Sequence, residues 1–354
     1  MGERPGPLEY LDVKPAEAWR RRRVFVTGCT GLLGAWLTRW LVEQQADVVG
    51  LIRDHGPQSN FYRLGLDRNV RIVHGALEDY PLVERSLNEY EIEVVFHLGA
   101  QTIVGIANEN PLSTFSANIQ GSWNVLEAAR QRKGIRAVVV ASSDKAYGAQ
   151  AQLPYREDAP LIGRHPYDAS KSCADLIAQM YWHTYHLPVA VTRCGNFYGG
   201  GDLNFNRIVP GTIRSLLDGQ RPIVRSDGAL RRDYLYIKEA VSAYVLLAER
   251  LLEGQAGGEG YNFSHGQPLR VLELVDIITG LMGRADLKPV ILNEATNEIP
   301  DQFLDASKAG ADLGWTPRYR LEDGLKETVA WYEEFFKAQH DARAAGQQTW
   351  AKSV

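Results

Sequence analysis

The sequence predicts an α/β protein with a doubly wound parallel sheet, followed by a smaller C-terminal α+β lobe. Two observations carry this prediction. Short runs rich in β-branched residues alternate with longer helical patterns through the first half of the chain, which is typical of a parallel sheet covered on both faces. A glycine-rich segment directly follows the first of these runs, at residues 28–34.

Six segments of the first half are expected to be strands, because each is a short, nearly continuous apolar run. They are residues 24–27, 47–52, 70–73, 93–96, 137–140 and 188–192. Helices are expected between them, most clearly at 32–43, 114–132 and 167–185. The alternation predicts one Rossmann-type domain over residues 21–193, preceded by an N-terminal extension over residues 1–20.

After Arg193 the pattern changes to loops, short strands and separate helices. The expected helices are 206–217, entered through Pro210, then 271–282 and 321–337. We interpret residues 194–340 as a substrate lobe whose boundary is interleaved with the first domain. Residues 1–20 and 341–354 are polar and irregular in pattern and are expected to be loose.

Composition excludes several classes of protein. The net charge is −4 and the isoelectric point is near 6.1, whereas nucleic-acid and membrane-surface proteins carry a broad basic excess. The three cysteines are widely spaced, which favours free thiols in a reducing compartment over disulfides or a metal site. The sequence shows neither a signal peptide nor a bilayer-spanning run. We therefore expect a cytoplasmic protein without a metal.

The glycine-rich segment predicts a dinucleotide site. Gly28 permits a tight turn, Gly31 lets the backbone approach a pyrophosphate, and Gly34 lets the helix pack close to the sheet. The N–H groups that begin the helix would face the phosphates. A glycine turn alone is a weak signal, but here it follows a strand and opens a helix. The expected cofactor-binding residues of the turn are Gly28, Thr30, Gly31, Leu32, Leu33 and Gly34.

The end of the second expected strand favours NADP over NAD. An acidic residue at this place would bind the adenosine ribose, but the chain has Ile52 followed by Arg53. A guanidinium can pair with a 2′-phosphate. The alternative is that Arg53 is a surface residue and Asp54 binds the ribose.

Tyr167 and Lys171 lie four residues apart on one helical face, so both can point at the same site. A phenol is a poor base at neutral pH. A neighbouring ammonium and a positive nicotinamide ring favour the phenolate, so that Tyr167 can accept a proton from a hydroxyl. The spacing alone is common by chance, and it gains weight from the preceding strands and glycine turn.

Ser143, Asp144 and Lys145 directly follow the fifth expected strand. Ligands bind at the carboxyl ends of parallel strands. Ser143 can hydrogen-bond the hydroxyl that is oxidised, while Asp144 and Lys145 offer an acid and a base in one loop. The alternative for Asp144 and Lys145 is a surface ion pair. The sequence does not decide which is the acid and which the base.

Together these residues resemble the extended short-chain dehydrogenase/reductases that modify nucleotide sugars, in particular the nucleotide-sugar 4,6-dehydratases. The likeness covers roughly residues 20–335 and includes the segments His97–Gln101, Asn118–Gly121, Arg193–Gly199, Arg232–Tyr234 and Leu313–Pro317. It implies further cofactor contacts from Ala76, Leu77, Leu98, Ala100, Gln101, Asn118, Tyr167 and Lys171. Substrate contacts are implied for Gln101, Ser143, Asn196, Arg207, Pro210 and Arg232.

Some of these positions have a structural alternative. Arg207 and Arg232 are candidates for the diphosphate, since arginine binds phosphate bidentately. A structural salt bridge is the alternative for both, and without the family likeness the two interpretations of Arg207 have about equal weight. For His97 we favour packing beneath the cofactor, and for Trp36 and Trp40 a place in the core. Ala76 stands where the family often has an adenine-contacting Asp.

The resemblance implies an enzyme that converts a nucleotide-diphosphate sugar, of the CDP-glucose or GDP-mannose type, to its 4-keto-6-deoxy form. NADP or NAD would be tightly bound and recycled, and the protein would be a homodimer or a dimer of dimers. Two alternatives remain open. A nucleotide-sugar 4-epimerase would share the oxidation without the elimination, and a non-catalytic NAD(P)-binding sensor would share only the fold.

Overall fold

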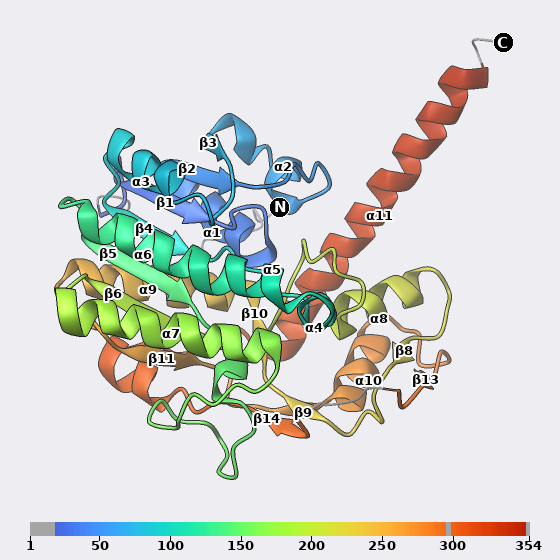
Figure 1. The fold of residues 1–354 in the computed structure, drawn as a ribbon. Coiled ribbons are helices and arrows are strands. Elements are labelled where there is room, and N and C mark those ends of the chain that lie inside the picture. The colour runs from blue at the N-terminus through green and yellow to red at the C-terminus, as the bar shows by residue number, and fades with distance from the viewer. Residues whose placement is uncertain (1–17, 295–298, 352–354) are drawn as a thin grey trace. The chain divides into compact units, whose positions relative to one another are not determined.

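The computed structural model describes residues 18–294 and 299–351, with side chains as far as Asp341. The chain forms two compact units (Figure 1). The first comprises residues up to Phe197 together with Arg232–Pro268 and Asp301–Arg318. The second comprises Tyr198–Arg231, Leu269–Pro300 and the residues from Tyr319 onward. The chain therefore passes between the units several times, and residues 232–268 and 301–318 of the expected second lobe belong to the first unit.

A seven-stranded parallel sheet forms the centre of the first unit, in the order β11-β6-β5-β4-β1-β2-β3. This arrangement confirms the predicted fold class. Its strands are β1 (Arg23–Thr27), β2 (Asp47–Ile52), β3 (Arg71–His74), β4 (Val94–His97), β5 (Ala137–Ala141), β6 (Val189–Cys194) and β11 (Gly260–Phe263). β11 was not expected from the sequence, because four residues that include Gly and Asn and no β-branched residue carry little strand signal.

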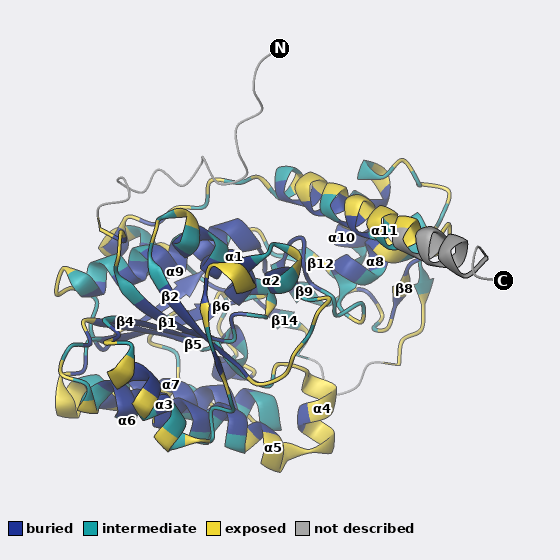
Figure 2. Cartoon of the chain, turned by 90° about the horizontal axis from the view of Figure 1, so that it is seen from above, coloured by how far each residue is buried: buried dark blue, intermediate teal, exposed yellow. Residues whose placement is uncertain are grey.

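Helices cover both faces of this sheet, as Figure 2 shows. α3 (Tyr80–Glu89), α6 (Gly121–Gln131) and α7 (Pro166–Tyr185) pack together on one face, while α1 (Leu32–Glu43) and α9 (Ile237–Leu252) pack on the other. Apart from the edge strand β3, the strands are buried along most of their length, which explains why the central strands read as continuous apolar runs rather than alternating ones.

Short elements complete the first unit. They are α2 (Asn60–Arg63), η1 (Leu66–Arg68), α4 (Val104–Glu109), α5 (Pro111–Phe115), the π-helix η2 (Ser116–Gln120), the 3-10 helix η3 (Asp144–Tyr147), β7 (Asn196–Tyr198), β10 (Tyr234–Tyr236), β14 (Asp301–Gln302) and the π-helix η4 (Ala309–Leu313). The expected single helix over residues 114–132 is thus divided into α5, η2 and α6. β7 pairs with β10, and β9 (Arg231–Arg232) lies where the chain enters the first unit again.

The second unit contains α8 (Ile208–Leu217), β8 (Ile223–Val224), β12 (Leu269–Arg270), α10 (Val271–Leu281), β13 (Val290–Ile291) and α11 (Leu321–Ala351). α11 continues far beyond residue 337, where the sequence analysis ended it. The residues after Lys337 are mostly Ala, Gln, Arg and other helix-compatible types, with no proline to stop the helix. Tyr332 of α11 packs on Phe205 and donates a hydrogen bond to the Asp202 carbonyl (2.6 Å).

Trp19 corrects the expectation that residues 1–20 are loose. Its indole is buried against Trp40 and Phe96, and its Nε1 donates to Glu249 Oε1 (2.8 Å). An aromatic side chain of this size gains more from burial than the local chain loses in ordering. Residues 1–17 lie outside the described residues. Trp36 and Trp40 are buried, as predicted.

Candidate active site

The turn from β1 into α1 has the geometry that a dinucleotide pyrophosphate requires. Gly28 has a φ of +70°, and a Cβ there would come within 2.8 Å of the Gly99 nitrogen. A Cβ on Gly34 would meet the Gly28 carbonyl at 2.0 Å. Only glycine fits both places. α1 begins after Gly31, and this N-cap residue makes no side-chain cap, which suits the first N–H groups of the helix to an anion.

His97 ends β4 beneath this turn and is fully enclosed. Thr27 Oγ1 accepts from the backbone nitrogens of Leu98 and Gly99 (3.1 and 3.0 Å), so its own proton points to His97 Nδ1 (2.9 Å). His97 Nε2 therefore carries the proton and donates to Ser122 Oγ (3.0 Å). Burial, with Lys171 nearby, lowers the pKa of His97 to about 3. A neutral packing histidine was the expected role.

The segment after β4 is tied down by Asn118, which the π-helix η2 carries. Asn118 Oδ1 accepts from the Gln101 nitrogen (2.7 Å), and its Nδ2 donates to the Gln101 carbonyl (3.0 Å) and to Ser170 Oγ (2.9 Å). π-bulges of this kind occur frequently at functional sites. In this structure Asn118 thus holds Gln101 and α7 together, and any cofactor contact would come from the segment that it positions.

Arg53 lies on the surface at the end of β2. Its Nε donates to Asp54 Oδ2 (2.7 Å), and both side chains are well exposed. An exposed ion pair between neighbouring residues is weak, so a phosphate could displace Asp54 from the guanidinium. Both the NADP interpretation of Arg53 and the ribose interpretation of Asp54 are compatible with this geometry.

α7 carries Tyr167 in its first turn and Lys171 in its second. Lys171 is buried, and its Nζ donates to the carbonyl of Ala141, the last residue of β5 (2.7 Å). Burial lowers the pKa of Lys171 to about 8, against the opposing effect of Asp175. The lysine therefore still carries its proton at neutral pH and can favour a phenolate on Tyr167.

The segment after β5 brings the acid/base candidates to the same edge of the sheet. Ser143 caps the short helix η3, its Oγ accepting from the Lys145 nitrogen (3.2 Å) and donating to Asp144 Oδ1 (2.9 Å). The Asp144 carboxyl is buried, and burial raises its pKa, against the lowering effects of Lys145, Ser143 and Arg232. A buried carboxyl with a raised pKa is not a surface ion pair. It is suited to donating a proton.

A buried ion pair between Arg193 and Asp175 is hydrogen-bonded to the end of η3. Arg193 of β6 makes a bidentate pair with Asp175 of α7 (Nε to Oδ2 2.9 Å, Nη2 to Oδ1 3.0 Å). Its Nη1 donates to the hydroxyl of Tyr147, the last residue of η3 (2.9 Å), and that hydroxyl donates to Asn262 Oδ1 (2.8 Å). Sequence reasoning missed Asp175 and Tyr147, because their partners are distant in the chain.

The expected substrate residues are divided between the units. Asn196 and Arg232 belong to the first unit, where Asn196 is exposed, Arg232 is buried, and Arg232 lies near enough to Asp144 to lower its pKa. Arg207 and Pro210 belong to the second unit. Arg207 pairs with Asp202 (Nη1 to Oδ2 3.1 Å), which is the structural alternative that its sequence context left open.

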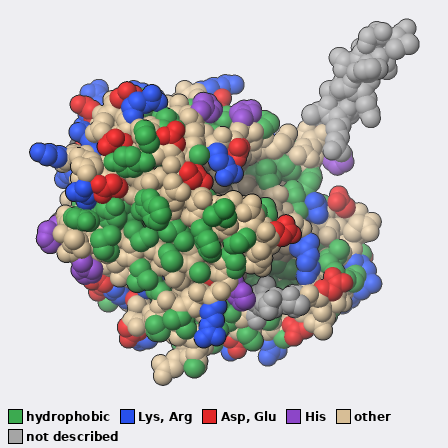
Figure 3. Space-filling view, viewed as in Figure 1, with side chains coloured by type: hydrophobic (Ala, Val, Ile, Leu, Met, Phe, Trp, Pro, Cys, Tyr) green, Lys and Arg blue, Asp and Glu red, His purple; other side chains and the backbone are tan. Residues whose placement is uncertain are grey.

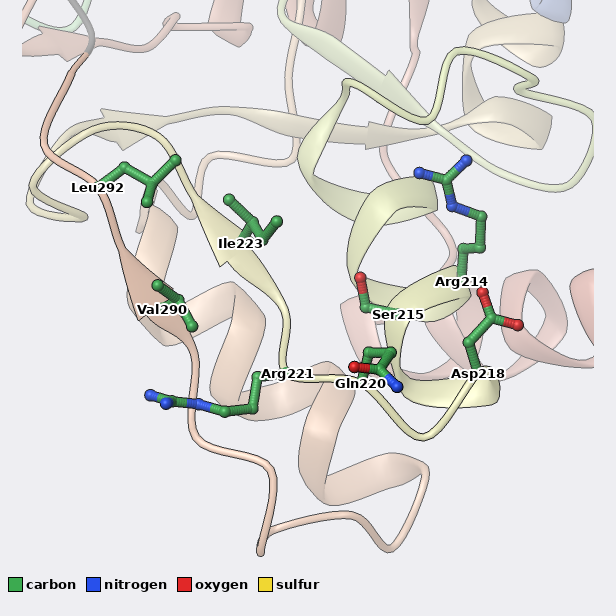
Figure 4. A pocket seen from close by; sticks show the side chains of 8 residues that line it. All are labelled: Arg214, Ser215, Asp218, Gln220, Arg221, Ile223, Val290 and Leu292. Carbon is green, nitrogen blue, oxygen red and sulfur yellow. The ribbon is translucent and has the colours of Figure 1, made fainter.

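The second unit also has an open cavity of its own, of about 610 Å³ (Figure 4). Side chains of α8 and of the β8 and β13 segments line it, and none of the expected site residues is among them: Arg214, Ser215, Asp218, Gln220, Arg221, Ile223, Val290 and Leu292. It therefore does not belong to the catalytic constellation.

The described residues were also compared with what a metal site and a membrane-spanning helix require. Their His, Cys, Asp and Glu side chains form no group of three suited to a metal ion. Among the described helices, none combines the length and the apolar composition that crossing a bilayer requires. The described cysteines are free thiols, and burial raises the pKa of Cys29 to about 12, so this thiol is unreactive.

Known proteins are similar to this chain in sequence and in fold over most of its length. The family model described as GDP-mannose 4,6 dehydratase matches residues 25–328. A CDP-glucose 4,6-dehydratase of Salmonella typhimurium is 33% identical over 91% of this chain and 93% of its own. A dTDP-glucose 4,6-dehydratase of Streptomyces niveus is 30% identical over 88% of this chain and 93% of its own.

Two solved structures illustrate the breadth of the likeness. The dTDP-glucose 4,6-dehydratase DesIV of Streptomyces venezuelae, solved with NAD and TYD bound, has a TM-score of 0.80 and 29% identity, covering 88% of this chain and 97% of its own. A UDP-glucose 4-epimerase of Thermotoga maritima, solved with UDP-glucose, has a TM-score of 0.81 and 27% identity, covering 89% and 99%.

Proposed function

This chain belongs to the GDP-mannose 4,6-dehydratase family, and from that premise we propose that it is a nucleotide-sugar 4,6-dehydratase with Asp144 as its acid. The observation that carries the proposal is the carboxyl of Asp144, which is buried and accepts a hydrogen bond from Ser143. Asp144 follows β5, and the carbonyl of Ala141, the last residue of that strand, accepts a hydrogen bond from Lys171. An epimerase needs to oxidise C4 but has no use for a proton donor aimed at a leaving hydroxyl.

The proposed reaction converts a nucleotide-diphosphate hexose to its 4-keto-6-deoxy form and water. A nicotinamide held at the glycine turn would supply the reversible hydride chemistry, by which the hydride of C4 would be transferred to C6. Tyr167, assisted by Ser143, accepts the proton of the 4-hydroxyl. The 4-ketone acidifies the C5 proton, which Lys145 removes, and Asp144 protonates the departing 6-hydroxyl. Lys145 gives a proton back to C5 when the hydride is added at C6, so that overall the proton spent by Asp144 is balanced by the one that Tyr167 takes from the 4-hydroxyl. The raised pKa of Asp144 supports its assignment as the acid, which leaves Lys145 as the base.

Substrate recognition is assigned to the residues that the family likeness implied. We propose that Gln101 and Asn196 position the sugar and that Arg207, Pro210 and Arg232 bind the nucleotide diphosphate, with CDP-glucose or a GDP-mannose type sugar as substrate. The likeness to the CDP-glucose enzyme of Salmonella typhimurium supports the first of these. Arg207 would exchange Asp202 for phosphate, a stronger bidentate partner.

Product analysis tests the function. The purified protein is incubated with CDP-glucose, GDP-mannose, dTDP-glucose and UDP-glucose, and we expect one of them to give a 4-keto product that has lost one water, seen by mass and by its absorbance in alkali. Tyr167→Phe should lower turnover by orders of magnitude while cofactor stays bound. Asp144→Asn should still oxidise C4 but accumulate reduced cofactor. A C4-inverted product without a ketone would establish the epimerase instead.

For the cofactor, we propose a preference for NADP carried by Arg53, with NAD as the alternative that the NAD-bound relatives favour. Arg53→Ala should weaken NADPH binding on the order of tenfold or more and leave NADH unchanged, because a 2′-phosphate loses its charge-assisted partner. Fluorescence titration measures both. The exposed Arg71, at the amino end of β3, provides the control. Equal effects of Arg53→Ala on both cofactors would refute the preference.

We also propose that the protein is a homodimer, or a dimer of dimers, formed through the helices α5, η2, α6 and α7. Large apolar side chains stand exposed along them, as the green cluster of Figure 3 illustrates: Leu112, Phe115, Trp123, Leu176 and Met180. α6 and α7 pack side by side, so these side chains form a contiguous face, and contiguous apolar faces mark interaction sites.

We also propose that the protein works in a reducing compartment, the cytoplasm, which its free thiols support.

A further inference from the structure

A row of five buried polar side chains connects the glycine turn with α7, the helix that carries Tyr167. This polar row consists of Thr27, His97, Asn118, Ser122 and Ser170, and none of the five is more than 3% exposed. They come from β1, β4, η2, α6 and α7, which all belong to the first unit. Polar groups at this depth are costly unless they are hydrogen-bonded.

The direction of the first hydrogen bonds in the polar row is fixed by the backbone. Thr27 Oγ1 accepts from two backbone nitrogens of the segment after β4, so its single proton goes to His97 Nδ1 (2.9 Å). His97 Nε2 then donates to Ser122 Oγ (3.0 Å). Ser122 requires the same direction, because its own proton is donated to the Asn118 carbonyl (2.6 Å) and its oxygen is left to accept from His97.

Asn118 continues the polar row towards the catalytic helix. Its Oδ1 accepts from the Gln101 nitrogen (2.7 Å), which fixes the orientation of the amide, and its Nδ2 donates to Ser170 Oγ (2.9 Å). Ser170 in turn donates its proton to the Tyr167 carbonyl (2.7 Å). The hydrogen bonds along the polar row therefore all point from the glycine turn to α7, and each side-chain polar atom in it has a partner.

The two ends of the polar row are places where position matters for the chemistry. Thr27 directly precedes Gly28 of the glycine turn. Tyr167 lies in the first turn of α7, and His165, the N-cap residue of that helix, makes no side-chain cap. The first turn of a helix lacks intrahelical partners for its N–H groups and is prone to fray without other support. The bonds from Asn118 to Ser170 and from Ser170 to the Tyr167 carbonyl tie this turn to η2.

We propose that Ser122 and Ser170 are positioning residues for Tyr167: the polar row holds the first turn of α7, and with it the Tyr167 phenol, at a fixed place relative to a dinucleotide at the glycine turn. This inference rests on the proposed function, in which Tyr167 accepts the proton of the 4-hydroxyl as the hydride leaves C4. A buried network with every member satisfied makes its surroundings rigid. Misplacing a reacting group by about 1 Å can cost on the order of a hundredfold in rate.

The first arm of the test asks whether the polar row acts as one unit, and it needs no substrate. Urea unfolding of the full-length protein is compared for Ser122→Ala, Ser170→Ala and the double variant. We expect each single variant to lower the urea midpoint. The double variant should lose clearly less than the sum of the two single losses, because a network broken at one hydroxyl has less to lose at the next.

Ser86→Ala is the matched control for this arm. Ser86 is also buried, and its hydroxyl donates to the Leu82 carbonyl (2.7 Å), four residues back along α3, as that of Ser122 does to Asn118. It is not part of the polar row, so its loss should add to that of Ser170→Ala. If the losses of Ser122→Ala and Ser170→Ala are additive as well, the polar row is not one unit and the proposal is overturned.

The second arm connects the polar row to Tyr167. Variants that are folded by circular dichroism are given CDP-glucose, and the rise of reduced-nicotinamide absorbance in a single turnover measures oxidation at C4. Ser122→Ala and Ser170→Ala should lower this rate and kcat by about tenfold or more. The KM for CDP-glucose and the Kd of the dinucleotide should stay within about twofold of the wild type, because neither serine is assigned a contact with them. Ser86→Ala should change none of these values.

The remaining outcomes separate the two claims. An unchanged oxidation rate in folded Ser122→Ala and Ser170→Ala would mean a merely structural role and would overturn the positioning proposal. Ser170→Cys, which keeps a side chain of similar shape but has only a weak donor, serves as the second variant if Ser170→Ala does not fold, and it should show the same loss of rate. If the wild type converts none of the four nucleotide sugars, the proposed function fails, while the urea experiment still decides whether the polar row is one unit.

Discussion

At the scale of single residues, the site depends on side chains whose pKa values are shifted by burial. Burial lowers the pKa of His97, whose hydrogen-bond partners are Thr27 and Ser122, and burial raises the pKa of Asp144. Lys171 keeps its charge at neutral pH although burial lowers its pKa to about 8. These states follow from enclosure by residues far away in the chain, so the sequence identified the residue types but not their protonation.

His97 makes stability depend on pH. The folded protein keeps His97 neutral down to a pKa of about 3, whereas the unfolded chain binds that proton near pH 6.5. Between these values the unfolded state holds more protons, so the free energy of unfolding falls as pH drops below 6.5, by about 1.4 kcal/mol per pH unit from this group. Urea unfolding at a series of pH values measures the slope.

The matched variants decide whether this dependence belongs to His97. His97→Gln should flatten the slope by one proton, although it lowers stability at neutral pH through the lost hydrogen bonds. His183→Gln, at an exposed position on α7, should leave the slope as in the wild type. A slope that survives in His97→Gln would contradict the assignment.

At the scale of elements, six of the seven central strands and the helices α1 and α7 were predictable because their signals are local. β1, α1 and β2 agree with the sequence analysis within a residue, since apolar runs and a glycine turn mark their ends. β11 and the division of residues 111–131 into α5, η2 and α6 were not predicted. The former depends on pairing with β6, and the latter on the bonds from Asn118 to Gln101.

The Arg193–Asp175 pair connects three of these elements, β6, α7 and η3. Asp175→Asn leaves a buried guanidinium without its counter-charge, and we expect the free energy of unfolding to fall by about 3 kcal/mol or more. Because Arg193 also holds Tyr147, dehydratase turnover should fall with it. Denaturant unfolding and turnover are measured in the same preparations.

The control for this prediction is Glu127→Gln, which breaks the half-exposed pair with Arg130 on α6 (Nη2 to Oε1 2.6 Å). Surface pairs contribute about 1 kcal/mol or less, so this variant should lose little stability and no turnover. Equal losses of unfolding free energy in the two variants would show that the buried pair stabilises the protein no more than the surface pair does.

At the scale of the whole molecule, the exposed apolar face of α5, η2, α6 and α7 is the main feature that a monomer leaves unexplained. Leu176→Glu should convert the dimer to a monomer or raise its dissociation constant strongly, because a charge in the centre of an apolar interface is left without a partner. Size-exclusion chromatography with light scattering measures the mass.

Ile223→Glu is the matched control, because Ile223 and Leu176 are both 55% exposed but Ile223 lies on β8 of the second unit. This substitution should leave the mass unchanged. A monomeric wild type, or a Leu176→Glu variant that remains a dimer, would refute the proposed interface.

The sequence by itself determined the fold class, the glycine turn, and the Tyr167 and Lys171 spacing. These features follow from backbone sterics and from the periodicity of strands and helices, which act over a few residues. Only the tertiary structure decided that Asp144 is buried rather than a surface ion pair and that Arg207 pairs with Asp202. Burial and charge partners depend on residues brought together from distant parts of the chain, and these set the pKa values on which the chemistry depends.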